Sequence, residues 1–320
     1  MSRPQPATPS PQDHTARSYV VGGQIVSVER LRPGLHVVAT PIGNLGDVTL
    51  RALAALAGAD LIACEDTRVS RKLLDRYGIR TPLTPYHDHN AAEARPKLLR
   101  RLGQGAALVL VSDAGTPLVS DPGYKLVREA QAAGHSVTAL PGASAVLAAL
   151  AVAGLPTDQF LFAGFLPPKA GARRARIAGL ARIPATLVLF ETGPRVGATL
   201  ADLAAGLGGQ RDAALCRELT KLHEEVRRGD LATLAEHYAN EEPRGEIVLV
   251  IGPPAAAEQP SAEDADALLR NALARTSLKA AVAEVAATTG LPRRQIYQRA
   301  LALEKSVGDG NNEETDATPR

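Results

Sequence analysis

The sequence is poor in residues that several protein classes require. It has two cysteines, Cys64 and Cys216, no tryptophan and only 3% aromatic residues. Each cysteine lies inside an apolar run, which excludes a disulfide framework and fits buried thiols in a reducing compartment. No apolar run reaches the length of a membrane-spanning helix, and the polar first residues do not resemble a secretory signal. We therefore expect a cytoplasmic protein with no membrane partner.

Several common catalytic signatures are also absent. No G-x-G-x-x-G turn follows the first predicted strand, which disfavours a dinucleotide-binding fold and the commonest methyltransferase fold. The chain has no Gly-Lys-Ser/Thr phosphate loop and no G-x-S-x-G nucleophile turn. No cysteines and histidines have the spacing of zinc ligands, so no metal site is predicted. The formal net charge is only +2, so any basic surface must be local.

The sequence does contain a regular alternation of short apolar runs and helical patterns. This alternation is typical of a mostly parallel sheet with helices on both faces, and it restarts after residues 154–156. The predicted order is a disordered arm (1–33), an N-terminal α/β domain (34–155), a C-terminal α/β domain with fewer helices (156–253), a linker (254–262), a helical domain (263–305) and a disordered acidic tail (306–320).

The loop at residues 112–124 follows the apolar run 106–111 and precedes a helical pattern. Open α/β sheets bind ligands at the carboxyl ends of their strands, so we expect this loop to face a ligand. Gly115 lets the backbone approach that ligand closely, and Pro117 stiffens the loop. An ordinary strand-to-helix turn is the alternative, because such residues also cluster in turns.

The segment 277–301 predicts two helices joined by a glycine turn, the pattern of a helix-turn-helix. Its second helix carries Arg293, Arg294 and Arg299 on a polar face, which favours contact with nucleic acid. The alternative is a small helical bundle that packs on the protein itself or on a second subunit. Two further basic helices are predicted, and their candidate RNA-binding residues are Arg68, Arg71, Lys72, Arg173 and Arg174.

Short motifs stand at the ends of the predicted strands. In chain order they are Thr40-Pro41-Ile42-Gly43-Asn44-Leu45, Glu65-Asp66-Thr67-Arg68, the loop 113–123, Pro141-Gly142-Ala143-Ser144-Ala145, Arg217-Glu218-Leu219-Thr220-Lys221 and Gly245-Glu246. Together they resemble the ribosomal small-subunit RNA methyltransferase I family of the tetrapyrrole methylase superfamily. The resemblance covers roughly residues 35–251, and the helical tail is similar to the one appended to this family.

The resemblance implies two α/β domains of the tetrapyrrole methylase (class III methyltransferase) type, with S-adenosylmethionine bound in the cleft between them. It also implies methyl transfer to the ribose 2′-oxygen of a cytidine in the decoding region of 16S rRNA, with the small ribosomal subunit as partner and a homodimer as assembly. The implied cofactor contacts are Pro41, Ile42, Gly43, Gly115, Thr116, Pro117, Val119, Ser144, Ala145, Phe190, Cys216 and Gly245. Pro194 stands where relatives often carry histidine, so no imidazole role is expected there.

An attack of a ribose hydroxyl on a sulfonium methyl needs positioning, and a general base would help. The candidate catalytic residues at strand ends are Glu65, Asp113, Arg217, Glu218 and Lys221. If residues 217–221 are extended, Arg217 and Lys221 share one side and can hold phosphates; a structural salt bridge to Glu218 is the alternative. Lys221 could act as the base only if burial lowers its pKa.

Two other functions remain open from the sequence. One is a tetrapyrrole C-methyltransferase of the precorrin or uroporphyrinogen type, although the basic helices and the tail suit RNA better than a porphyrin-type substrate. The other is a nucleic-acid-binding regulator that senses S-adenosylmethionine. The regulator predicts cofactor binding without turnover.

Overall fold

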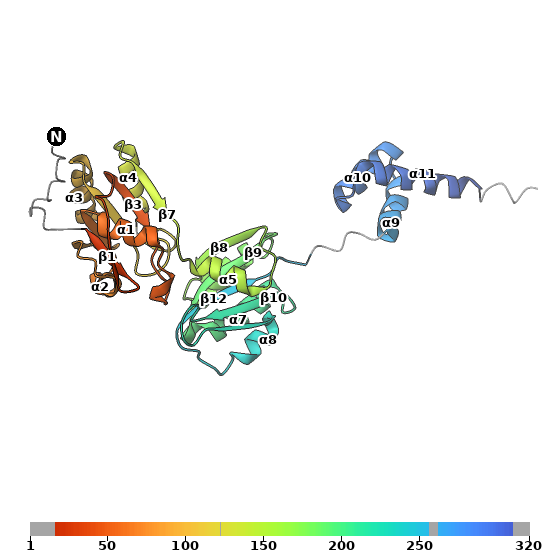
Figure 1. The fold of residues 1–320 in the computed structure, drawn as a ribbon. Helices are drawn as coiled ribbons and strands as arrows, with labels where there is room; N and C mark the ends of the chain where they lie inside the picture. Colours follow the sequence, from red (N-terminus) through yellow and green to blue (C-terminus); the bar gives the residue numbers. More distant parts are fainter. Residues whose placement is uncertain (1–16, 122, 256–261, 310–320) are drawn as a thin grey trace, which may run out of the picture. The chain divides into compact units, whose positions relative to one another are not determined.

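The computed structural model describes residues 17–121, 123–255 and 262–309. The chain divides into two compact units, Met1–Gly252 and Pro253–Arg320, which are described separately (Figure 1). Within the described ranges, no helix is both long enough and apolar enough to cross a membrane. The first unit holds two five-stranded sheets and a hairpin.

The first sheet is entirely parallel, with the strand order β5-β4-β6-β3-β7. Its strands are β3 (Gly34–Val38), β4 (Leu61–Cys64), β5 (Leu83–Pro85), β6 (Ala107–Val111) and β7 (Val137–Leu140). The helices that follow them are α1 (Leu50–Gly58), α2 (Thr67–Arg76), α3 (Ala91–Gly103), α4 (Tyr124–Ala132) and α5 (Ala145–Ala153). One core packs α1 and α2 on the sheet, and a separate core packs α3 and α4 on it. The prediction of a parallel sheet covered on both faces is confirmed here.

The second sheet is mixed, with the order β11-β10-β12-β9-β8 and only β8 parallel to its neighbour β9. Its strands are β8 (Phe160–Phe165), β9 (Thr186–Thr192), β10 (Asp212–Arg217), β11 (Glu225–Asp230) and β12 (Glu246–Ile251). The segment that joins β10 to β11 is residues 218–224, and a parallel crossover needs a dozen or more residues. The two strands therefore form a hairpin, which the alternation of strands and helices does not reveal.

Helices cover this second sheet as well. Helices α6 (Ala170–Leu180), α7 (Gly193–Leu207) and α8 (Leu231–His237) share one core with it. Helix α5 packs against the other face, where Ala149 and Leu150 meet Val248 and Val250 of β12 (Figure 1). Although α5 precedes the predicted boundary at residue 155, it packs on the second sheet.

The predicted disordered arm is wrong for residues 17–33. Strands β1 (Ser18–Val21) and β2 (Gln24–Ser27) form an antiparallel hairpin. Tyr19 is buried in the core with α1, and the Val20 N–H donates to the Tyr77 carbonyl at 2.8 Å. The rest of the predicted arm, residues 1–16, lies outside the described residues.

Asp60 holds the segments beside this hairpin. Its Oδ1 accepts from Arg17 and its Oδ2 from Arg30, each at 2.7 Å, and Oδ2 also accepts from the Ala107 N–H. The Arg30 hydrogen bond, together with Arg17 and Ala107, holds the pKa of Asp60 well below its usual range. Asp60 therefore contributes most to stability when it is ionised.

Asp60→Asn should lower the free energy of unfolding by about 1–2 kcal/mol, since both arginines are partly exposed and water screens the pairs. Because the folded pKa is depressed, this loss should be fully present above about pH 4 and shrink as the pH falls further. Urea unfolding at several pH values measures it. The exposed Asp75→Asn is the control, and an equal loss in both variants would contradict the anchoring role.

The second unit consists of three described helices, α9 (Ala262–Leu273), α10 (Leu278–Thr289) and α11 (Arg293–Asp309). Ser277 caps α10, and Gly290 ends it with a φ of 70°, so the predicted glycine turn is present. Ile296 and Ala300 of α11 pack with α9 and α10 in one core. The predicted disorder is wrong for residues 306–309, which belong to α11. Residues 310–320 and most of the predicted linker, 256–261, lie outside the described residues.

Candidate active site

A cavity of about 440 Å³ opens at the carboxyl ends of the strands of the first sheet, and residues of both sheets line it. Its first wall is the loop after β6 together with the start of α5, and its second wall is formed by the ends of β8 and β9 and the start of β12. The predicted cofactor residues that line it are Ile42, Gly115, Thr116, Val119, Ser144, Ala145, Phe190 and Gly245. We call this cavity the cleft.

The loop after β6 is held in place by hydrogen bonds to both neighbouring loops. Thr40 and Gly115 exchange backbone N–H···O bonds of 2.9 and 3.0 Å, and the Thr116 hydroxyl donates to the Ala143 carbonyl at 3.3 Å. Gly115 has a φ of 76°, and a Cβ there would lie 3.3 Å from Ile42. Glycine is therefore needed for this close approach, and the loop is preorganised for a ligand.

The remaining predicted cofactor residues are not in the cleft. Pro41 and Gly43 line a neighbouring cavity instead, and Pro117 is buried. Cys216 is fully buried in the core of the second sheet, where desolvation raises the pKa of its thiol to about 11. The Cys216 side chain therefore packs like an ordinary apolar core residue and does not line the cleft.

One wall of the cleft is acidic, with Glu65, Asp113 and Asp121 on it. Burial raises the pKa of Glu65, and the carboxylates of Asp113 and Asp121 raise it further. Burial also raises the pKa of Asp121, against a hydrogen bond from Ser112. Asp113 is fixed by the Asp66 N–H, which donates to its Oδ1 at 2.9 Å. Among the described residues, no basic side chain lines the cleft, so this wall attracts positive charge.

Arg217 ends β10, and residues 218–221 form a tight turn, which corrects the expectation of an extended segment over 217–221. Glu218 and Thr220 have φ values of 50° and 68°, so side chains do not alternate across the segment. Arg217 turns to Glu225 at 2.9 Å, whereas Lys221 Nζ pairs with Glu218 at 2.8 Å and Glu246 at 2.9 Å. Arg217 and Lys221 therefore do not face one surface.

Lys221 stays charged. Burial lowers its pKa, but the hydrogen bonds to Glu218 and Glu246 outweigh burial and hold the pKa above its ordinary value. A lysine that acts as a neutral general base is thus excluded at this position. The stem of Lys221 lies directly on Gly43, where an added Cβ would be 2.5 Å from Lys221 Cγ. The second half of the unit thereby contacts the first beside the cleft.

The predicted RNA-binding residues have different surroundings. Arg71 and Arg174 are exposed, Arg68 is exposed and pairs with Asp66, and Lys72 lines the neighbouring cavity. Arg173 is buried and paired with Asp202 at 2.7 Å, so its prediction as a surface contact is wrong. In the second unit, Arg293 and Arg294 are exposed, whereas Arg299 holds Asp266 at 2.8 Å.

Sequence reasoning missed several residues of the cleft. Asp121 lies within the loop after β6, and its place in that motif was a usable signal. Of the other missed residues, Leu219 belongs to the motif at 217–221. Those at strand ends of the second sheet include Phe165, Glu191, Thr192, Ile247 and Val248.

Comparison with known proteins identifies the fold and the family. Residues 34–235 match the family of tetrapyrrole (corrin/porphyrin) methylases, and residues 259–304 match the RsmI C-terminal HTH domain. Solved structures with this fold include the methyltransferase CobJ, 22% identical over 69% of this chain and 95% of that one, with a TM-score of 0.52. A conserved hypothetical protein from Aeropyrum pernix K1 covers 87% of this chain and 98% of its own, with a TM-score of 0.54 and 18% identity.

Sequence relatives are much closer. The ribosomal RNA small subunit methyltransferase I of Mesorhizobium japonicum is 52% identical over 91% of this chain and 99% of its own length. The protein of the same name from Erythrobacter litoralis is 51% identical over 87% of this chain and 98% of its own. With this identity over nearly the whole length, the chain belongs to the ribosomal RNA small subunit methyltransferase I family.

Proposed function

We propose that this protein transfers the methyl group of S-adenosylmethionine to the ribose 2′-oxygen of a cytidine in the decoding region of 16S rRNA. The observation that carries the proposal is the preorganised, acidic cleft in a chain whose relatives are named as small-subunit rRNA methyltransferases. The helix-turn-helix unit and the exposed cations of α2 and α11 support RNA as the substrate.

The residues of the cleft fit this cofactor. When bound, S-adenosylmethionine supplies a methyl group already activated on a sulfonium cation. Ile42, Ala145 and Phe190 offer apolar surface to its nucleoside, and Gly115 lets the loop backbone come close. The carboxylate of Asp121, which lines only the cleft, would suit its positive charges or its ribose hydroxyls. The volume of the cleft lies in the range of small-molecule sites.

We assign the general base to Glu65. Its carboxylate lies on the cleft wall, and its raised pKa makes it a better proton acceptor than an ordinary glutamate. It takes the proton from the ribose hydroxyl as the oxygen attacks. Lys221 stays protonated between Glu218 and Glu246, so its role is to hold a backbone phosphate near the cleft mouth.

The second unit adds RNA affinity through α11. Arg293→Ala combined with Arg294→Ala should weaken binding to small ribosomal subunits about tenfold and reduce the salt slope by about 2, because two phosphate contacts are lost. Filter binding at several salt concentrations measures this. Arg270→Ala removes an exposed cation from α9 as the control. If the double variant and the wild type bound small subunits with equal affinity and equal salt dependence, α11 would not contact RNA, and the second unit would serve only in packing.

The direct test of the proposal is tritium transfer from labelled S-adenosylmethionine. We expect label on 16S rRNA or small subunits and none on a uroporphyrinogen. Cofactor binding without any transfer would favour the regulator. A homodimer and a cytoplasmic location stay predictions that rest on the family.

A further inference from the structure

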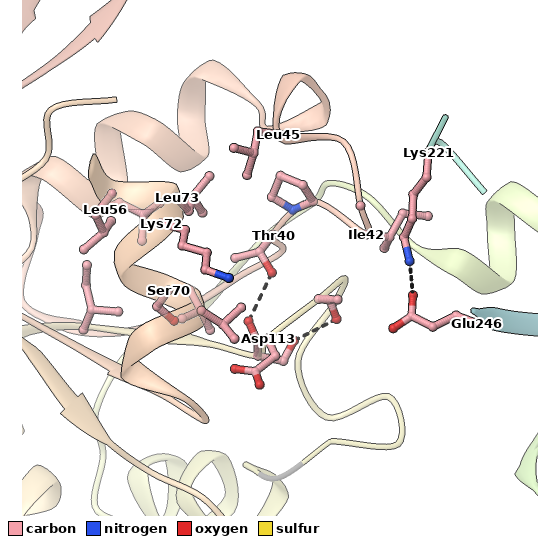
Figure 2. Close-up of a pocket in the computed structure, with 18 residues that line it drawn as sticks. Thr40, Ile42, Leu45, Leu56, Ser70, Lys72, Leu73, Asp113, Lys221 and Glu246 are labelled. Atoms are coloured by element: carbon pink, nitrogen blue, oxygen red, sulfur yellow. Dashed lines mark hydrogen bonds and ion pairs between the residues drawn. The ribbon is translucent and has the colours of Figure 1, made fainter. Parts of the chain in front are cut away.

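A second cavity of about 250 Å³ adjoins the cleft (Figure 2). The two cavities share Ile42, Asp113, Ala114 and Glu246, so whatever fills the second one lies beside the cofactor. We call it the side pocket. Of the expected cofactor residues, only Pro41, Ile42 and Gly43 line the side pocket, so the cofactor prediction does not account for the rest of its walls.

The walls of the side pocket are apolar and held firmly. They come from α1, β4, β6 and α2, and they include Leu56, Ile62, Leu73 and Val111. The loop at its mouth is fixed by Tyr77, whose hydroxyl donates to the Leu45 carbonyl at 2.8 Å. At about 30 Å³ for each water, the volume takes several waters or one single-ring base.

Four charged side chains line this largely apolar space. Lys221 and Glu246 pair with each other at 2.9 Å, which leaves Lys72 and Asp113 as the two charges of opposite sign that can face a ligand. Lys72 extends from α2 with its amine directed into the pocket (Figure 2). In the described part of the chain, Lys72 has no hydrogen bond or ion pair. Asp113 offers a carboxylate fixed by the Asp66 N–H. The apolar walls suit the flat faces of a ring. The Lys72 ammonium can donate to acceptors at the edge of that ring, and the Asp113 carboxylate can accept from a donor there.

We propose that the side pocket binds the base of the nucleotide whose ribose is methylated, and that it reads cytosine. This rests on the proposed function. The exocyclic amine of cytosine donates a hydrogen bond to the Asp113 carboxylate, which is how carboxylates recognise that amine. The acceptor atoms of the cytosine ring accept a hydrogen bond from the Lys72 amine. Uracil carries a carbonyl oxygen where cytosine has the amine. That oxygen and the Asp113 carboxylate are both acceptors, so no hydrogen bond forms between them and uracil is disfavoured. An unpaired nucleotide can be extruded into such a pocket, which leaves its ribose at the boundary with the cleft.

The test compares Lys72→Met with Lys125→Met. Each variant removes one exposed lysine, but Lys125 belongs to α4 and lines neither cavity. The methylated nucleotide is first mapped with the wild-type enzyme, and small subunits are then prepared with cytidine or uridine at that position. Tritium transfer gives kcat/KM for each subunit, and calorimetry gives the affinity for S-adenosylmethionine.

We expect Lys72→Met to lower kcat/KM on cytidine subunits at least tenfold and to reduce the preference for cytidine over uridine at least fivefold, with cofactor affinity unchanged. Lys125→Met should lower kcat/KM less than threefold and keep the preference. Equal effects in the two variants, or a preference that Lys72→Met retains, would overturn the base pocket while the methyltransferase function stands. A wild-type enzyme that labels no rRNA would instead overturn the proposed function.

Discussion

Thr116→Lys should lower the affinity for S-adenosylmethionine at least a hundredfold in a protein that still folds. Thr116 lines the cleft, and its hydroxyl bonds the Ala143 carbonyl at 3.3 Å. A lysine there fills part of the cleft and brings a positive charge to the wall of Glu65, Asp113 and Asp121, where it competes with the cationic cofactor. Isothermal calorimetry measures the affinity, and circular dichroism confirms the fold.

Thr116→Val is the matched control, because it keeps the shape and removes only the hydroxyl. It should weaken binding of S-adenosylmethionine by about 0.5–1.5 kcal/mol, which is about twofold to twelvefold in affinity. If folded Thr116→Lys bound the cofactor as tightly as the wild type, the cleft would not be the cofactor site.

Lys221→Met should lower turnover on the ribosomal substrate at least tenfold, or about 1.4 kcal/mol of transition-state stabilisation. The methionine keeps most of the stem that lies on Gly43 and removes the ammonium that faces Glu218 and Glu246. The melting temperature and the affinity for S-adenosylmethionine should barely change. Single-turnover kinetics on small subunits with saturating cofactor measures the effect.

Arg227→Met provides the comparison for Lys221→Met. Arg227 lies in β11, pairs with Glu225 at 2.8 Å and lines neither cavity. Its loss should leave turnover within twofold of the wild type. If Lys221→Met lowered the melting temperature and cofactor affinity together, with unchanged turnover in the cofactor-loaded enzyme, Lys221 would be a structural residue.

The first sheet and the cofactor loop could be predicted because their signals are local. Apolar runs mark its buried strands, and the glycine at residue 115 marks a backbone conformation that other residues rarely adopt. The turn at 217–221 could not be predicted in this way. Its positive φ values fall on Glu218 and Thr220, which carry no glycine signal, and Glu218 is fixed by the distant Glu246 N–H.

Partners far apart in the sequence explain the other differences. Arg173 resembles a surface cation in a basic helix, yet Asp202 of α7 pairs with it in the interior. The hairpin β1–β2 has only four residues in each strand, and its order depends on Tyr77 and Asp60 at sites that local composition does not reveal. The alternation of apolar runs and helical patterns likewise does not distinguish the antiparallel β10–β11 hairpin from a parallel pair of strands.

The most direct test of the account is the chemical identity of the methylated nucleoside. Small ribosomal subunits are labelled with the protein and tritiated S-adenosylmethionine, and the rRNA is digested to nucleosides and separated by liquid chromatography with mass spectrometry. The account predicts that the label elutes as 2′-O-methylcytidine and is lost with Thr116→Lys. Label on a nucleobase, or on a ribose other than that of cytidine, would contradict it.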